Sequence, residues 1–133
     1  HRIITSAGID LAHHVIFGGP GETYATAEEG IRNCMQLETC VVLASTGIRI
    51  YPHTPIHKRA LAEGRISEHT CLLEPTYYFS AAIEKHLLDQ MISRAWRKNK
   101  RLVFPPENAR IICQSLKTLC GAKGLLWNQI CRR

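Results

Sequence analysis

The chain has 133 residues, enough for one compact domain with a hydrophobic core, and it carries a formal net charge of +6. Hydrophobic residues make up 45% of it, which excludes an intrinsically disordered composition. No run approaches the roughly 20 apolar residues of a membrane span, so we expect none. The densest basic group, within residues 94–101, ends a predicted helix and carries one aromatic residue, which argues against nucleic-acid binding.

The first half of the chain predicts a strand, a helix and a second strand. Residues 15–17 form a short apolar run, preceded by a tail that ends at residues 8–10. Thr23 or Thr26 can cap the next helix, and Thr26-x-x-Glu29 fits a capping box. The continuous apolar run 40–44 is typical of a strand buried on both faces. A crossover of this length predicts a right-handed parallel unit.

The second half is predicted to be mainly helical. Residues 56–62 should form a short helix stopped by Gly64, followed by an extended segment at 74–78. Ser80 is expected to cap a long amphipathic helix, whose apolar positions are Ile83, Leu87, Met91, Ala95 and Trp96. Residues 107–120 predict a last helix stopped by Gly121, with Ile111, Ile112, Leu116 and Leu119 facing inward. The tail 124–131 has no assigned structure.

Two parallel strands alone do not make a stable sheet, and both predicted strands are apolar. We therefore expect an α/β fold: the C-terminal part of a parallel-stranded partial (β/α) barrel over residues 1–66, then a mainly helical extension over residues 67–133. The sequence starts at His1 without an initiator methionine, and residues 2–8 resemble a domain interior, so we expect a fragment of a longer protein. Its exposed sheet edges predict self-association.

Cysteine and histidine spacing does not indicate a metal site. The six cysteines contain no C-x-x-C pair, so we expect reduced, mostly buried thiols in a cytoplasmic protein. His13-His14 and the His53…His57 pair have metal-like spacing, but no nearby third ligand completes either set. The sequence also contains no Ser-His-Asp or Cys-His pattern of a nucleophilic enzyme, so no catalytic residue is assigned.

Glycines follow both predicted strands, where ligands gather in parallel α/β proteins. In the turn 18–21, glycines let backbone N–H groups point at an anionic or nucleotide-like ligand beside a helix N-terminus. Glu22 either binds a ligand amine or ribose hydroxyl, or favours the helix N-terminus. After the second strand, Arg49 either holds a carboxylate or phosphate or pairs with a neighbouring acid, and Tyr51 lies close behind it.

These two segments resemble motifs of the radical S-adenosylmethionine superfamily. Ile16-Phe17-Gly18-Gly19-Pro20-Gly21-Glu22-Thr23 is similar to its fifth-strand turn, I-x-G-x-P-G-E-T. Gly47-Ile48-Arg49-Ile50-Tyr51-Pro52-His53-Thr54-Pro55 is similar to its sixth-strand exit, which often ends in Tyr-Pro-Gly-Thr-Pro; His53 stands where glycine is usual. The sequence Gly-Ile-Arg-Ile-Tyr-Pro at residues 47–52 and the later Ala-x-x-Glu-Gly at residues 60–64 resemble the B12-binding branch of this superfamily. The resemblance covers residues 15–64.

The resemblance implies an Fe–S oxidoreductase that uses S-adenosylmethionine and a 4Fe–4S cluster, with cobalamin a further candidate cofactor. Ile16 would pack near the adenine, and the backbone at Gly18, Gly19, Gly21 and Glu22 would shape that side of the cofactor pocket. Arg49 and Tyr51 would contact cofactor or substrate. The cluster motif C-x3-C-x2-C is absent from this sequence.

We therefore expect this chain to bind no cofactor and to be inactive alone. Its partners would be the N-terminal half of the same polypeptide and a small-molecule substrate. The alternative is a standalone α/β-plus-helical interaction module without cofactor. A nucleotide-binding enzyme of another kind is less favoured, because the sequence has no G-x-G-x-x-G and no phosphate-binding lysine motif.

Overall fold

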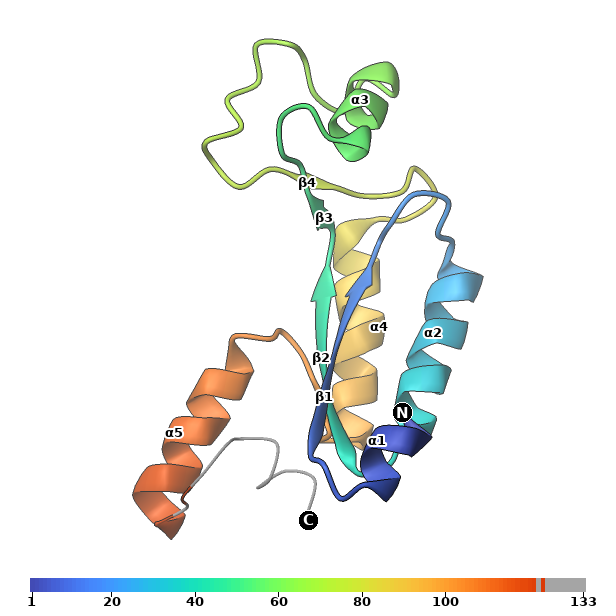
Figure 1. Cartoon of the computed structure of the whole chain (residues 1–133). Coiled ribbons are helices and arrows are strands. Elements are labelled where there is room, and N and C mark those ends of the chain that lie inside the picture. The colour runs from blue at the N-terminus through green and yellow to red at the C-terminus, as the bar shows by residue number, and fades with distance from the viewer. Residues whose placement is uncertain (122, 124–133) are drawn as a thin grey trace.

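The centre of the molecule is a parallel three-stranded sheet in the order β1-β2-β5 (Figure 1). The computed structural model describes residues 1–121 and 123. β1 (Leu11–Phe17) pairs with β2 (Cys40–Thr46) along its whole length, and β2 pairs with the short β5 (Leu102–Val103). Helix α2 (Tyr24–Gln36) connects β1 to β2, and α4 (Lys85–Lys98) precedes β5. The α/β class and the predicted parallel unit are confirmed.

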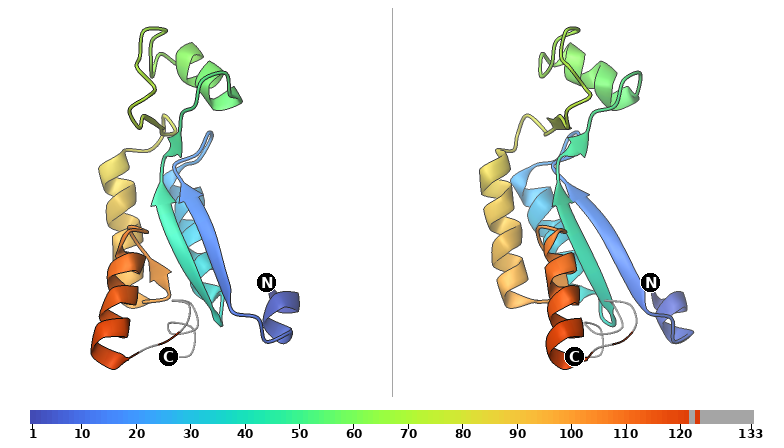
Figure 2. Two further views of the ribbon diagram at one scale, coloured as in Figure 1. Left: turned by 60° about the vertical axis from the view of Figure 1, so that its left-hand side comes forward. Right: turned by 90° about the vertical axis from the view of Figure 1, so that its left-hand side faces the viewer.

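Helices cover both faces of β2, which explains its continuous apolar run. On one face α2 and α4 pack against alternate strand residues, including Phe17, Cys40, Val42 and Ala44. On the other face Val41, Leu43 and Val103 pack against α5 (Asn108–Cys120). Figure 2 shows α5 on the side of the sheet away from α2. Because a strand alternates its side chains between the two faces of the sheet, both faces of β2 are buried.

A smaller unit extends from the carboxyl edge of the sheet. β3 (Ile48–Arg49) pairs antiparallel with β4 (Tyr77–Tyr78), and α3 (Pro55–Ala62) packs beside them around buried Ile50, Ala60 and Tyr78. The side chain of Thr54 caps α3 by accepting from His57 N–H, and Pro55 occupies the first turn, where its missing N–H costs nothing. Gly64 has φ +66, so the predicted glycine stop is confirmed.

Three element boundaries in the first half differ from the prediction. β1 begins at Leu11 rather than Val15, because His13 and His14 take part in the strand despite their polarity. Residues 2–6 form the short helix α1 (Arg2–Ser6) instead of part of a tail. The capping box is Thr23 with Thr26, whose side chains and backbone N–H groups exchange hydrogen bonds, so the prediction of Thr26 with Glu29 was wrong.

The second half differs more. Helix α4 begins at Lys85, and Ser80 does not cap it; Ser80 is buried, and its N–H donates to Gly18 O at 2.9 Å. The buried positions of α4 are Leu88, Ile92 and Ala95, whereas Leu87 is 39% exposed. The strand β5 was not predicted. In α5, which ends as predicted at left-handed Gly121, the expectation of inward Ile111 and Leu119 was wrong, because they are 63% and 82% exposed. The predicted tail 124–131 lies outside the described residues.

Candidate functional site

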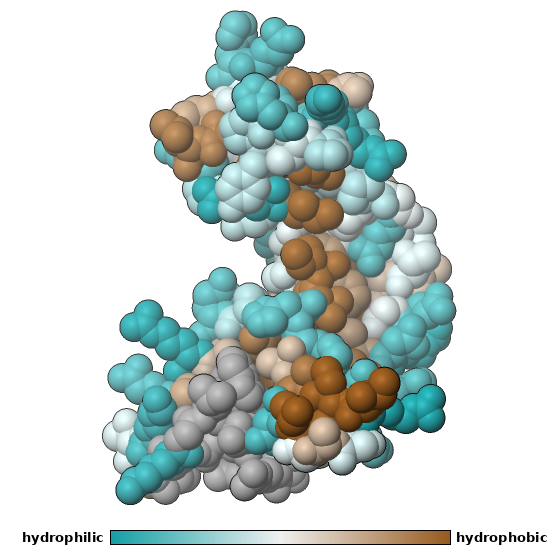
Figure 3. Space-filling model, viewed as in Figure 1, coloured by the Kyte–Doolittle hydropathy of each residue, from teal (hydrophilic) through white to brown (hydrophobic). Residues whose placement is uncertain are grey.

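A cleft of 540 Å³ opens at the carboxyl ends of the parallel strands. Its walls come from the ends of β1 and β2, from the β3–β4 ribbon, from the start of α4 and from the segment after β5. The lining residues are Ile16, Ser45, Thr46, Gly47, Arg49, Tyr77, Lys85, Asp89, Phe104, Pro105, Pro106 and Glu107. Figure 3 shows the molecule hollowed between its α3 end and its α5 end, with apolar residues along the middle. This is the edge where parallel α/β proteins bind ligands.

Arg49 supplies the most distinctive polar group of the cleft. β3 holds its backbone against β4, and its guanidinium lies over the Tyr51 ring at 4.9 Å from the centroid. The Nε atom is buried and has no hydrogen-bond partner in the described structure. Among the described residues no carboxylate forms an ion pair with Arg49, so the predicted alternative of a neighbouring acidic partner is not observed. An unpartnered buried guanidinium N–H is costly, which favours a bound acceptor.

A second polar group crosses the cleft from β2 to α4. Thr46 Oγ1 donates to Asp89 Oδ1 at 2.8 Å, and Lys85 Nζ pairs with Asp89 Oδ2 at 2.5 Å. The Asp89 carboxylate is thus neutralised by Lys85, and Arg49 supplies a charge on the cleft that has no such partner. Sequence reasoning missed all three residues, although Lys85 and Asp89 have the i, i+4 spacing of a helical ion pair.

The glycine-rich turn after β1 is closed by its own glutamate. The Glu22 carboxylate accepts from Gly18 N–H and from Gly19 N–H, the latter at 3.2 Å. The expectation that these two N–H groups are free to meet a ligand is therefore wrong for this structure. Gly21 has φ +79 and nothing within 4 Å of where a Cβ would stand, so it serves the turn geometry. None of the turn residues 18–22 lines the cleft.

The two glycine-bearing strand ends touch each other, and an aromatic ring fills the space their glycines leave. Gly47 N–H donates to Phe17 O at 2.8 Å. A Cβ on Gly47 would stand 2.6 Å from Phe79 Cζ, and one on Gly18 would stand 3.0 Å from Phe79 Cδ1. These glycines therefore admit the Phe79 side chain. The resemblance assigned Gly18 to ligand approach; its close neighbour here is protein.

Three further positions of the family motifs are Ile16, Tyr51 and His53. Ile16 is 56% exposed on the cleft, and Tyr51 is 51% exposed behind Arg49. His53, at the position where the family motif has glycine, adopts φ +64, the left-handed conformation that glycine favours. The loop geometry implied by the glycine of the family motif is therefore available here despite the different residue.

The described cysteines do not form a cluster site. Cys34 and Cys40 are buried, and burial raises the pKa of each thiol. Cys71 is exposed and Cys113 is half-buried, so the expectation of mostly buried thiols holds for two of these four. Because the four do not gather, this part of the chain does not fit a 4Fe–4S cluster. A different group does gather: His13 lies with His1 and Cys40, and neither His14 nor the His53 and His57 pair takes part in it.

Comparison with known proteins adds no support to the resemblance, which is based on the two motifs at residues 16–23 and 47–55. No family model, curated protein or solved structure matches this chain. Over the described residues, no helix has both the length and the apolar character needed to cross a bilayer.

Proposed function

We propose that this chain is the C-terminal part of a radical S-adenosylmethionine Fe–S oxidoreductase and contributes one wall of its cofactor and substrate pocket. The observation that carries the proposal is the position of the two motifs. They follow neighbouring parallel strands and meet at the carboxyl edge, where Ile16 and Arg49 line one cleft. Parallel strands with α2 and α4 on one face agree with a partial (β/α) barrel, whereas α5 on the other face lies outside that arrangement and would belong to the extension.

The cleft fits part of a cofactor of this kind. Its volume of 540 Å³ lies within the range of about 300–1,000 Å³ usual for small-molecule sites. The Arg49 guanidinium would supply a charge-assisted hydrogen bond to a carboxylate of S-adenosylmethionine or substrate, and exposed Ile16 would pack near the adenine. When cofactor and cluster are bound, the chemistry supplied is hydrogen-atom abstraction from substrate; the residues of this chain bind and orient. The cluster ligands would belong to an N-terminal half, together with any cobalamin site.

The proposal is tested by joining the chain to the coding sequence that precedes it. A C-x3-C-x2-C motif about a hundred or more residues upstream is expected from the size of a barrel. The joined protein, with its cluster reconstituted under reducing and oxygen-free conditions, should release 5′-deoxyadenosine. No upstream motif, or no release from a protein with an intact cluster, refutes the proposal.

A matched pair of arginine variants tests the role of Arg49. Arg49→Met in the joined protein should weaken S-adenosylmethionine or substrate binding by about 10–100-fold, because it removes a charge-assisted hydrogen bond. Arg59→Met is the control, since Arg59 is exposed on α3 and pairs with Glu63 at 3.2 Å. Equal effects of the two variants would show that Arg49 has no special contact with either ligand.

The second candidate is an interaction module that needs no cofactor. It is favoured by the closed turn, in which Glu22 satisfies Gly18 and Gly19, and by Phe79 beside Gly18 and Gly47. This candidate predicts no binding of S-adenosylmethionine to the joined protein in calorimetry and a monomeric hydrodynamic size. A partial barrel predicts self-association of the isolated chain through its sheet edge.

We also propose a cytoplasmic location and a small-molecule substrate. The location is supported by the free thiols of Cys34, Cys40, Cys71 and Cys113, since proteins exported to oxidising compartments generally form disulfides. Its measurement is thiol titration of protein taken directly from cells. Four or more free thiols per unfolded chain are expected, whereas fewer than four contradict the location.

A further inference from the structure

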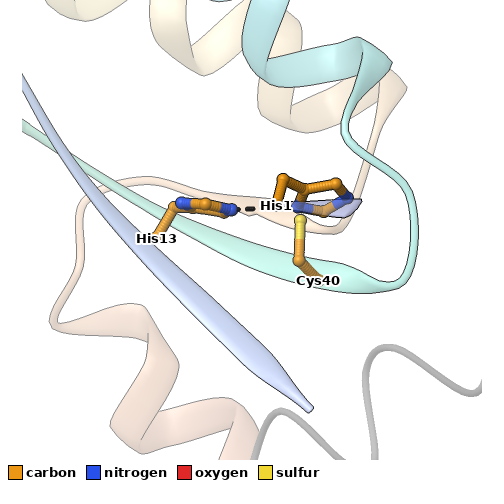
Figure 4. A group of neighbouring side chains, drawn as sticks. All are labelled: His1, His13 and Cys40. Atoms are coloured by element: carbon orange, nitrogen blue, oxygen red, sulfur yellow. Dashed lines mark hydrogen bonds between the residues drawn. The ribbon is translucent and has the colours of Figure 1, made fainter. Parts of the chain in front are cut away.

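Three soft or borderline metal donors converge at the amino-terminal edge of the sheet, opposite the cleft. They are His1, which precedes α1, His13 in β1, and Cys40, the first residue of β2. One potential ligand atom from each lies within 4.8 Å of the other two. Figure 4 shows the His13 and Cys40 side chains directed toward the His1 ring from neighbouring strands. Three separate elements thus supply one group.

The sheet register explains why His13 and Cys40 meet. Leu11 is the partner of Cys40 in the parallel pairing, so His13, two residues along β1, projects from the same face as Cys40. His1 Nδ1 then lies 3.1 Å from His13 Nε2, within hydrogen-bond distance, and the ring centroids are 5.4 Å apart. The two imidazoles therefore present nitrogen atoms to each other beside a buried sulfur.

We propose that His1 Nδ1, His13 Nε2 and Cys40 Sγ bind one Zn²⁺ ion, with water in the fourth position. Zinc–nitrogen bonds of 2.0–2.1 Å place two tetrahedral ligand nitrogens about 3.3 Å apart, close to the separation of His1 and His13. Two imidazoles and a thiolate suit zinc better than the oxygen-preferring Mg²⁺ or Ca²⁺. Zinc replaces the Cys40 thiol proton, which leaves to solvent, and each imidazole keeps its proton on its other nitrogen.

The metal explains how α1 is attached. None of the residues of α1 is buried, and Ile3 is 88% exposed, so apolar packing contributes little to holding this helix on the sheet. His1, immediately before α1, makes the contact with His13. A zinc ion bound by His1, His13 and Cys40 would replace that one hydrogen-bond contact with three coordinate bonds. The site is distant from the cleft, so its failure would leave the proposed function unaffected.

Metal titration of the full chain tests this site. For this measurement the chain is prepared without a histidine tag and with its α-amino group acetylated, so that the terminal amine cannot bind the metal. We expect one Zn²⁺ per chain by metal analysis after dialysis, and one Co²⁺ with a thiolate-to-metal charge-transfer band. The midpoint of thermal unfolding should rise with zinc concentration. A chain that binds no stoichiometric metal, or gives no thiolate band, overturns the proposal.

Four variants identify the ligands. His1→Ala, His13→Ala and Cys40→Ser should each weaken affinity at least about tenfold, the lower range seen even for residues that only support a zinc ligand. His14→Ala is the matched control, since the exposed His14 points to the opposite face of β1 and should leave binding unchanged. Because His1 is exposed, its variant remains decisive if Cys40→Ser fails to fold. Equal losses in His13→Ala and His14→Ala would indicate non-specific imidazole binding and refute the site.

Discussion

Replacing Gly47 with alanine tests whether the glycines of the strand ends make room for Phe79. A Cβ on Gly47 would lie 2.6 Å from Phe79 Cζ, 2.8 Å from Phe79 Cε2 and 3.1 Å from Tyr77 Cβ. Overpacking of this kind costs about 1–3 kcal/mol. The φ of +79 adds about 1–2 kcal/mol for any residue with a Cβ. We therefore expect Gly47→Ala to lower the free energy of unfolding by roughly 2–5 kcal/mol.

Gly21→Ala is the control that separates the two contributions. Gly21 has the same φ of +79, but nothing lies within 4 Å of its added Cβ, so only the backbone cost of about 1–2 kcal/mol applies. Urea unfolding of both variants measures the difference. In a double-mutant cycle, Phe79→Ala should recover the steric part of the Gly47→Ala loss. Equal losses for the two glycine variants, or no coupling with Phe79, would refute the packing role.

Three further predictions concern stability. Leu88→Ala should cost about 2–5 kcal/mol, whereas Leu87→Ala on the exposed side of α4 should cost much less, and urea midpoints distinguish them. Thr23→Ala should cost about 0.5–2 kcal/mol through loss of the cap, and Glu29→Ala close to nothing; the reverse order in thermal unfolding would contradict the capping box described here. The pKa of Tyr78 is raised, first by burial and then by its hydrogen bond to the Glu63 carboxylate. The stability that the protonated Tyr78 contributes is therefore present below about pH 10 and lost as the pH rises above it. Tyr78→Phe should make the free energy of unfolding less dependent on pH in this alkaline range.

Local sequence patterns predicted the elements whose signals are complete within a few residues. The run 40–44 and the glycine stops at Gly64 and Gly121 are of this kind, and the short helix predicted over residues 56–62 begins only one residue earlier, at Pro55. β5 could not be predicted, because its two residues become a strand only through pairing with β2. Of the apolar positions predicted around α4, Ile83 and Ala95 are buried and Met91 and Trp96 pack against the core, whereas Leu87 is exposed and Leu88 and Ile92 were missed.

The site was predictable only as far as its residues adjoin strand ends. Arg49 follows that rule and was found, whereas Ile16, which also lines the cleft, was expected from the family resemblance alone. Phe79 was missed because its role depends on approach to glycines from 32 and 61 positions earlier in the chain, which no local pattern reveals. His1, His13 and Cys40 were missed for a similar reason: their contact depends on the register of β1 and β2 and on the position of α1.

The left-handed backbone at His53 has a consequence for which residues this position can hold. A side chain at φ +64 costs about 1–2 kcal/mol in the folded loop, whereas glycine loses more conformational freedom on folding, by about 0.5–1 kcal/mol. The second cost offsets only part of the first. The loop itself is fixed by Thr54, whose N–H and hydroxyl both donate to Tyr51 O. Exchange between glycine and histidine therefore changes the free energy of unfolding by at most about 1.5 kcal/mol, and the loop keeps its shape with either residue.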